Sequence, residues 1–129
     1  MNWVAAVMLL AVLQSLVFSG LVAKARGQYK VSAPAISGNA MFERYFRVHY
    51  NTNELLLIFL PSLWLFGLYL SATWAAVLGG IYLVGRVVYA IGYISAPEKR
   101  ETGFGLSAGP TVILLLGALF GVIRSIVAG

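Results

Sequence analysis

Two long stretches without a charged side chain constrain this sequence more than any other feature. The first, from Trp3 to Ala23, has 21 residues, and the second, from Leu55 to Gly85, is longer still. About 20 apolar residues are enough for a helix to cross a hydrocarbon core of roughly 30 Å. Only 10% of all residues are charged, whereas soluble domains carry roughly 25%. The sequence therefore predicts an integral membrane protein.

The second uncharged stretch is too long for one crossing, since a single helix of this length would measure roughly 46 Å. Its most polar segment, Ser71-Ala72-Thr73, predicts a tight turn between two helices. Together with the first stretch and a last one that stops at Arg124, this makes four spans in a single domain, residues 1–129. We expect the spans at about residues 2–24, 41–70, 73–96 and 102–124. The predicted fold class is an all-α, four-helix transmembrane bundle.

A cleaved signal peptide is the alternative for the first stretch, because Ala23-Lys24-Ala25 has the form of a cleavage site. However, the chain starts without a basic residue, and the stretch is longer than the apolar part of a usual signal peptide. We therefore interpret it as the first membrane span.

Basic residues are concentrated around two of the three predicted loops. They are Lys24, Arg26, Lys30, Arg44 and Arg47 in and beside the first loop, and Lys99 and Arg100 in the third. Because basic loops tend to stay in the cytoplasm, we expect these two loops on the cytoplasmic side and both chain ends on the opposite side. The short loops favour a bacterial inner membrane over the endoplasmic reticulum.

Two predicted helices carry polar side chains at membrane depth. They are Arg47, Asn51 and Glu54 on the second helix, and Arg86, Tyr89 and Tyr93 on the third. Spacings of three and four residues place each set on one helical face. Ionisable groups at this depth are costly and usually functional. Since both sets are about equally far from the cytoplasmic loops, we predict that they face each other in one polar pocket.

A structural ion pair between Glu54 and Arg86 is the simpler interpretation of this cluster. It leaves the other polar side chains, and Arg100 just beyond them, without a function. Several arginines suit carboxylates or phosphates, and one glutamate suits an ammonium group. A small zwitterion with more than one carboxylate, such as glutathione, matches this set, whereas a dinucleotide or a phospholipid head group has no obvious need for Glu54.

The chain has no cysteine and a single histidine, His49. The lack of cysteine excludes disulfides and a cysteine nucleophile. A single histidine without cysteines gives too few soft ligands, so the sequence predicts no metal site. Thiol chemistry must therefore come from a ligand. We also expect no nucleic-acid partner. Small-residue pairs in the last span, Gly105 with Gly109 and Gly117 with Gly121, indicate packing faces inside the bundle or between subunits.

Four segments, taken in order, resemble the MAPEG family, the membrane-associated proteins in eicosanoid and glutathione metabolism. They are Lys30–Pro34, Phe42–Glu54, Gly85–Tyr93 and Glu98–Phe104. The resemblance extends over residues 23–120 and is greatest to microsomal glutathione transferases of types two and three and to leukotriene-C synthases.

This resemblance implies a homotrimer that binds glutathione, its co-substrate, between neighbouring subunits. The positions that match glutathione contacts are Arg47, Asn51, Glu54, Arg86, Tyr89 and Tyr93, with Arg26 and His49 contributed by the adjacent subunit. Arg100 matches the arginine that activates the thiol, so it is the candidate catalytic residue. Gly27 and Leu55 stand where leukotriene-C synthases have an arginine and a tyrosine, which argues against leukotriene synthesis.

The expected function is a membrane-bound, detoxifying glutathione transferase that conjugates the thiolate to lipophilic electrophiles. Reduction of lipid hydroperoxides would use the same site, and the sequence does not separate the two activities. One alternative is a non-catalytic lipid-binding or scaffold protein of the same family, which the presence of Arg47, Glu54, Arg86 and Arg100 together argues against. Another is a small efflux transporter, but the first predicted helix lacks the carboxylate that such a transporter needs.

Overall fold

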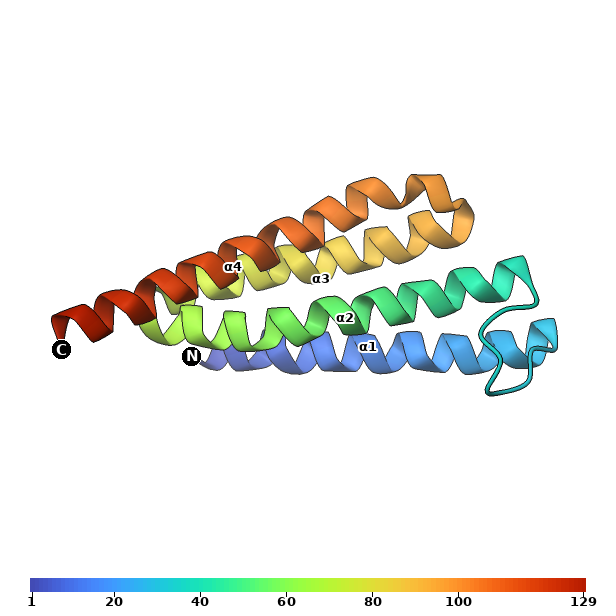
Figure 1. The fold of residues 1–129 in the computed structure, drawn as a ribbon, viewed down its shortest axis with the longest axis horizontal. Coiled ribbons are helices and arrows are strands. Elements are labelled where there is room, and N and C mark those ends of the chain that lie inside the picture. The colour runs from blue at the N-terminus through green and yellow to red at the C-terminus, as the bar shows by residue number, and fades with distance from the viewer.

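The computed structural model describes residues 1–129, which form four long helices (Figure 1). They are α1 at Asn2–Tyr29, α2 at Ala40–Tyr69, α3 at Ala72–Ser95 and α4 at Glu101–Ala128, with a short 3-10 helix, η1, at Pro97–Arg100. All four long helices are apolar enough to cross a membrane. The prediction of an all-α, four-helix, multi-pass membrane protein is therefore confirmed.

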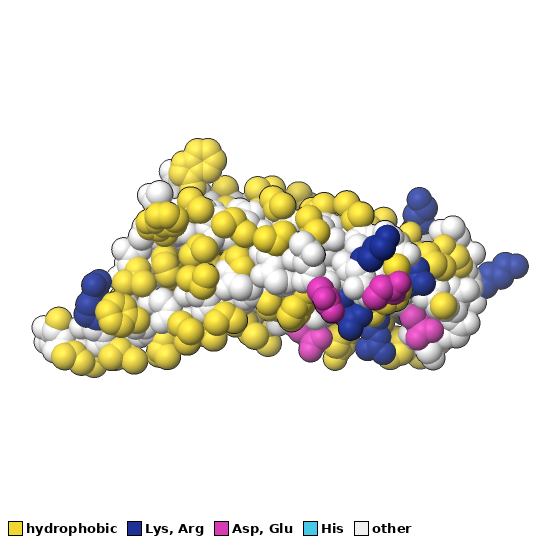
Figure 2. Space-filling model, turned by 90° about the horizontal axis from the view of Figure 1, so that it is seen from above, with side chains coloured by type: hydrophobic (Ala, Val, Ile, Leu, Met, Phe, Trp, Pro, Cys, Tyr) yellow, Lys and Arg dark blue, Asp and Glu magenta, His cyan; other side chains and the backbone are white.

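The helices run along the long axis of the molecule, with α2 and α3 each packed against both α1 and α4. Both chain ends lie at one end of the bundle, and the loop before α2 and the η1 connection lie at the other (Figure 1). Charged side chains gather mainly at one end of the face seen in Figure 2, and hydrophobic side chains cover much of the remainder. Such a surface suits a bundle whose middle is surrounded by lipid.

Local chemistry explains where the helices begin and end. The Asn39 side chain accepts a hydrogen bond from the Phe42 N–H (2.9 Å), and the Ser71 hydroxyl accepts one from the Trp74 N–H (3.1 Å). Both are typical N-caps, and Ser71 lies in the polar stretch that predicted the turn. Helix α1 continues past residue 24, where we expected the span to end, until Lys30 adopts a left-handed conformation with φ of 57°.

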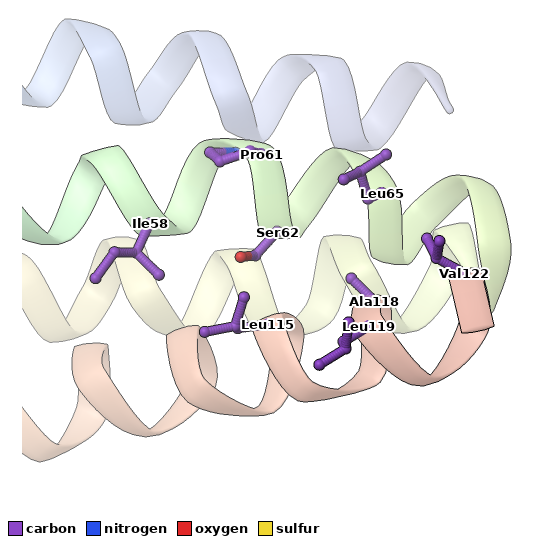
Figure 3. Close-up of a pocket in the computed structure, with 8 residues that line it drawn as sticks. All are labelled: Ile58, Pro61, Ser62, Leu65, Leu115, Ala118, Leu119 and Val122. Atoms are coloured by element: carbon purple, nitrogen blue, oxygen red, sulfur yellow. The ribbon is translucent and has the colours of Figure 1, made fainter.

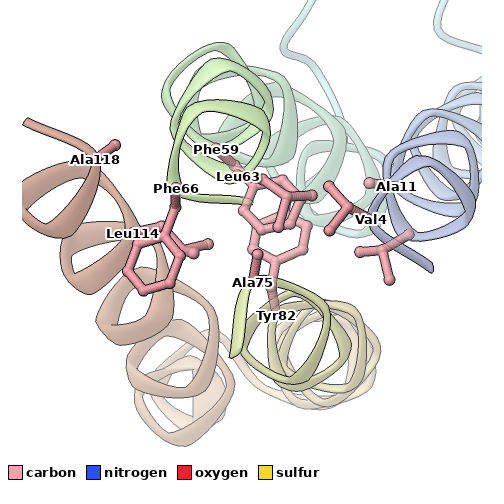
Figure 4. Packing of buried hydrophobic residues seen from close by; sticks show 10 residues of the cluster. Val4, Ala11, Phe59, Leu63, Phe66, Ala75, Tyr82, Leu114 and Ala118 are labelled. Atoms are coloured by element: carbon pink, nitrogen blue, oxygen red, sulfur yellow. The ribbon is translucent and has the colours of Figure 1, made fainter. Parts of the chain in front are cut away.

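The largest group of buried side chains joins all four helices (Figure 4). Phe59 of α2 stacks on Tyr82 of α3 with ring centroids 3.7 Å apart and an interplanar angle of 9°. Val4 of α1 and Leu114 of α4 are also fully buried in this cluster. The first helix thus contributes to the core of the bundle, as a membrane span would.

Glycines allow α4 to approach its neighbours closely. A Cβ atom at Gly103 would overlap the backbone of Tyr89, and one at Gly85 would lie 2.8 Å from the Ser107 nitrogen. Of the two small-residue pairs, Gly117 and Gly121 pack against the last turns of α2. A Cβ atom at either residue of the other pair, Gly105 or Gly109, would meet nothing within 4 Å, and this pair lies on the outer face of α4.

The substitution Gly103→Ala is expected to lower the free energy of unfolding by about 1–3 kcal/mol, the usual cost of overpacking. The new methyl group would meet the Tyr89 backbone, which cannot move aside as a flexible side chain can. Gly105→Ala is the matched control, because its methyl group meets nothing within 4 Å and alanine favours a helix. Thermal unfolding of both variants in detergent measures the difference, and equal midpoints would contradict the packing argument.

Candidate functional site

Arg86 is fully buried where α2, α3 and α4 meet. Its Nη1 donates hydrogen bonds to Asn51 Oδ1 (2.8 Å) and Thr52 Oγ1 (3.3 Å) of α2, and its Nε donates to Ser107 Oγ (3.1 Å) of α4. The guanidinium also lies over the Tyr89 ring, 4.2 Å from its centroid. The bond between Asn51 and Arg86 confirms that the polar faces of the second and third predicted helices meet.

The structure does not contain the ion pair between Glu54 and Arg86, which was the simpler interpretation of the cluster. The partners of Arg86 are neutral side chains, and Glu54 is exposed one turn beyond Asn51. Arg86 Nη2 is buried without a partner. Sequence reasoning missed Thr52 and Ser107, although a hydroxyl side chain at membrane depth was the available signal for both.

Two tyrosines connect Arg86 to the arginine at the start of α4. The Tyr89 and Tyr93 rings lie one turn apart on α3, with centroids separated by 5.6 Å. The Arg100 guanidinium lies 6.0 Å from the centroid of the Tyr93 ring, and its Nη1 donates to the Pro97 carbonyl (2.7 Å). The result is a row in which an arginine stands at each end of a pair of phenol rings.

Two small cavities border this row. The Arg100 cavity, of about 180 Å³, is lined by Asn51, Tyr89, Arg100, Glu101 and Phe104. The Arg47 cavity, of about 250 Å³, is lined by Ala40, Glu43, Arg44, Arg47, Tyr93 and Pro97. Since the two tyrosine rings are neighbours, the cavities lie next to each other. Sequence analysis did not single out the carboxylates of Glu43 and Glu101.

Arg44 in the Arg47 cavity has a clear structural function. Its Nη1 donates to the carbonyl oxygens of Ile94 and Ser95, both at 3.0 Å. These are among the last carbonyls of α3, which have no partner within the helix, and a cation there is favourable. Arg44 therefore holds the end of α3 against the start of α2 and shapes the mouth of the cavity.

Four residues that were expected in the site line neither cavity of their own protomer: Arg26, His49, Glu54 and Arg86. Arg26 Nη1 donates to the carbonyls of Val31 (3.3 Å) and Ala35 (2.7 Å). Its guanidinium also lies over the Phe42 ring, 4.9 Å from the centroid. Arg26 thus organises the loop between α1 and α2.

The imidazole of His49 belongs to a separate polar network between α1 and α2. Ser15 Oγ donates to Asn53 Oδ1, and the Asn53 amide nitrogen lies 3.1 Å from His49 Nε2. With the amide oriented in this way, Nε2 accepts a hydrogen bond and the proton of a neutral imidazole is on Nδ1. His49 is therefore oriented by its own protomer, although it lines neither polar cavity.

A third cavity, of about 510 Å³, lies between α2 and α4 nearer the chain ends (Figure 3). Its lining is Ile58, Pro61, Ser62, Leu65, Leu115, Ala118, Leu119 and Val122. Ile58 follows Glu54 by four residues and Leu65 follows Ile58 by seven, so they continue the helical face that carries Arg47 and Asn51. One face of α2 thus changes from polar to apolar along its length.

Comparison of the chain with known proteins identifies its family. Residues 4–120 match the family model described as the MAPEG family. Microsomal glutathione S-transferase 2 of Homo sapiens is 46% identical over 116 residues, which cover 89% of this chain and 79% of the relative. Leukotriene C4 synthase of Cavia porcellus is 36% identical over 119 residues, covering 92% and 79%. An uncharacterised protein of Synechocystis sp. is 47% identical over 121 residues, covering 94% and 88%.

Proposed function

Because the chain belongs to the MAPEG family, we propose that it is a membrane-bound glutathione transferase that acts on lipophilic electrophiles. One observation carries the proposal: a polar site with Arg47, Asn51, Tyr93 and Arg100 shares a helical face with an apolar cavity. Microsomal glutathione S-transferase 2 is, by its name, a glutathione transferase. The arrangement offers a place for a hydrophilic thiol and a separate place for its lipid-soluble partner.

The dimensions of the α2 face suit glutathione. From Arg47 to Glu54 the helix rises about 10 Å, and an extended tripeptide is also about 10 Å long. Arginine pairs with carboxylates, an amide such as Asn51 pairs with peptide groups, and a glutamate pairs with an ammonium group. Glutathione carries all of these groups and a thiol. In this proposal Arg86 acts indirectly, because it holds the side chains of Asn51 and Tyr89 in place.

Arg100 is the residue that we propose to activate the thiol. A thiol of this type has a reference pKa of about 8.5, so most of it is protonated at neutral pH. A guanidinium beside the sulfur favours the thiolate and lowers that pKa. The sulfur then forms a bond to an electrophilic carbon while a C=C π bond, or a bond to a leaving group, breaks. Where no leaving group departs, a proton from water completes the product.

We propose the reduction of lipid hydroperoxides as a second activity of the same thiolate. The sulfur would attack the outer peroxide oxygen, the O–O bond would break, and the lipid alkoxide would take a proton from water and leave as an alcohol. A second glutathione would then convert the sulfenic acid to a disulfide and release water. The apolar cavity between α2 and α4 supports this activity because it is open to lipid-soluble substrates of either kind.

The assembly that we propose is a homotrimer in which Arg26 and His49 reach the glutathione of a neighbouring subunit. Arg26 lies on α1, and His49 lies off the α2 face that carries Arg47 and Glu54; both side chains are partly exposed, which supports this arrangement. We also propose that the loop before α2 and the η1 connection face the cytoplasm, since basic residues cluster there. The polar cavities would then open toward cytoplasmic glutathione.

Arg47→Ala is expected to weaken glutathione binding at least about tenfold, since a hydrogen bond to a charged group contributes about 1.5–3 kcal/mol. Glu54→Ala should weaken it similarly. Arg124→Ala removes the same side chain near the C-terminal end of α4, where Arg124 contacts the Tyr69 carbonyl, so it serves as the control. Calorimetric titration of detergent-solubilised protein measures all three. If folded wild-type protein bound no glutathione, the lipid-binding or scaffold alternative would replace the transferase.

Arg100→Ala is expected to lower turnover at neutral pH by about 10- to 100-fold, because the thiol then ionises near its reference pKa of about 8.5. The loss should shrink as the pH approaches about 9, where the thiol ionises without help. Glutathione affinity should change much less than turnover. The measurement is a pH profile of kcat with a chromogenic aryl halide, and an unchanged profile would remove Arg100 from the mechanism.

A further inference from the structure

The site contains a carboxylate that the proposed reaction does not use, that of Glu101, the first residue of α4. We propose that Glu101 makes the site selective for lipophilic electrophiles whose polar end is uncharged. Electrophiles with a carboxylate beside the reactive carbon would be disfavoured. This inference rests on the proposed transferase function and deepens it by naming the class of its second substrate.

The position of Glu101 on α4 is the first argument. It lines the Arg100 cavity together with Asn51, Tyr89, Arg100 and Phe104. Leu115, which follows Glu101 by fourteen residues on the same helical face, lines the apolar cavity. Glu101 therefore stands at the polar end of the groove between α2 and α4. An electrophile that lies in this groove with its reactive carbon near Arg100 would have its polar end beside Glu101.

The second argument is that nearby cations are already engaged. Arg86 donates to three side chains and Arg44 donates to two carbonyls at the end of α3. Arg100 donates to the Pro97 carbonyl and, in the proposed reaction, faces the thiolate. The positive N-terminal end of α4 has Glu101 itself in its first turn. Arg47, in the neighbouring cavity, pairs with a carboxylate of glutathione in the proposed function. With glutathione bound, the exposed arginines of the site thus have partners, and the thiolate adds negative charge.

The size of the effect follows from Coulomb repulsion. Two like charges about 6 Å apart at the edge of a protein reduce binding of the second charge by roughly three- to thirtyfold. Salt screens interactions between exposed charges, and Glu101 is exposed. The preference for uncharged electrophiles should therefore weaken as the ionic strength rises.

A matched pair of substrates tests the inference: a 4-oxo-2-alkenoic acid with a long alkyl tail, and its methyl ester. The readout is the ratio of kcat/KM for ester and acid, because comparing this ratio between variants cancels the intrinsic reactivity of each compound. Glu101→Gln is expected to shift the ratio toward the acid by roughly three- to thirtyfold. Glu98→Gln is the control, since Glu98 is an exposed carboxylate of η1 that lines neither polar cavity.

The expected result is a wild-type ratio that favours the ester and falls with added salt, and a shift in Glu101→Gln alone. An unchanged ratio in Glu101→Gln would overturn the inference. An equal shift in Glu98→Gln would overturn it too, because the selectivity would then come from the overall negative charge of the surface and not from the position of Glu101. If the wild-type enzyme conjugated neither compound nor any other electrophile, the transferase function itself would fail. Conjugation without selectivity would leave that function intact and reject only the assignment of Glu101.

Discussion

The buried guanidinium of Arg86 is the interaction on which the rest of this structure depends. A charge inside an apolar bundle is tolerable only when its donors are paired. Arg86 meets most of this demand with hydrogen bonds from Nε and Nη1 to Asn51, Thr52 and Ser107, which belong to two different helices, while its Nη2 has no partner. These bonds set the relative rotation of α2, α3 and α4. One of them orients Asn51, and the guanidinium also lies over the Tyr89 ring, so Arg86 contacts two side chains that line the Arg100 cavity.

The close approach of α3 and α4 makes this arrangement possible. Gly85 and Gly103 let the two backbones come nearer than any side chain would allow. Ser107 therefore reaches Arg86, and the start of α4 places Arg100 over the Tyr93 ring. A steric feature of small residues thus determines where the candidate catalytic cation lies. Stability and the geometry of the site are coupled through the same contact between two helices.

The site lies where the molecule changes from a charged end to an apolar body (Figure 2). On one side are the polar cavities beside Arg47 and Arg100, and on the other is the apolar cavity between α2 and α4 (Figure 3). A reaction between a water-soluble thiol and a lipid-soluble electrophile needs this boundary, because each reactant is concentrated in a different phase. In the proposal, the carboxylate of Glu101 lies where the thiol and the electrophile meet and disfavours electrophiles that carry a carboxylate.

The sequence by itself determined the four membrane-spanning helices, the polar face of α2 and the family, because uncharged runs, local spacing and ordered motifs encode them directly. Only the tertiary structure decided the partners of these residues. It paired Arg86 with Thr52 and Ser107 instead of Glu54, directed Arg26 into the first loop and separated His49 from the polar cavities. It also placed Gly117 and Gly121 inside the bundle and Gly105 and Gly109 outside. The physical reason is that helical periodicity predicts which side chains share a face, whereas their partners depend on how neighbouring helices rotate and approach, which is set by packing between residues far apart in the chain.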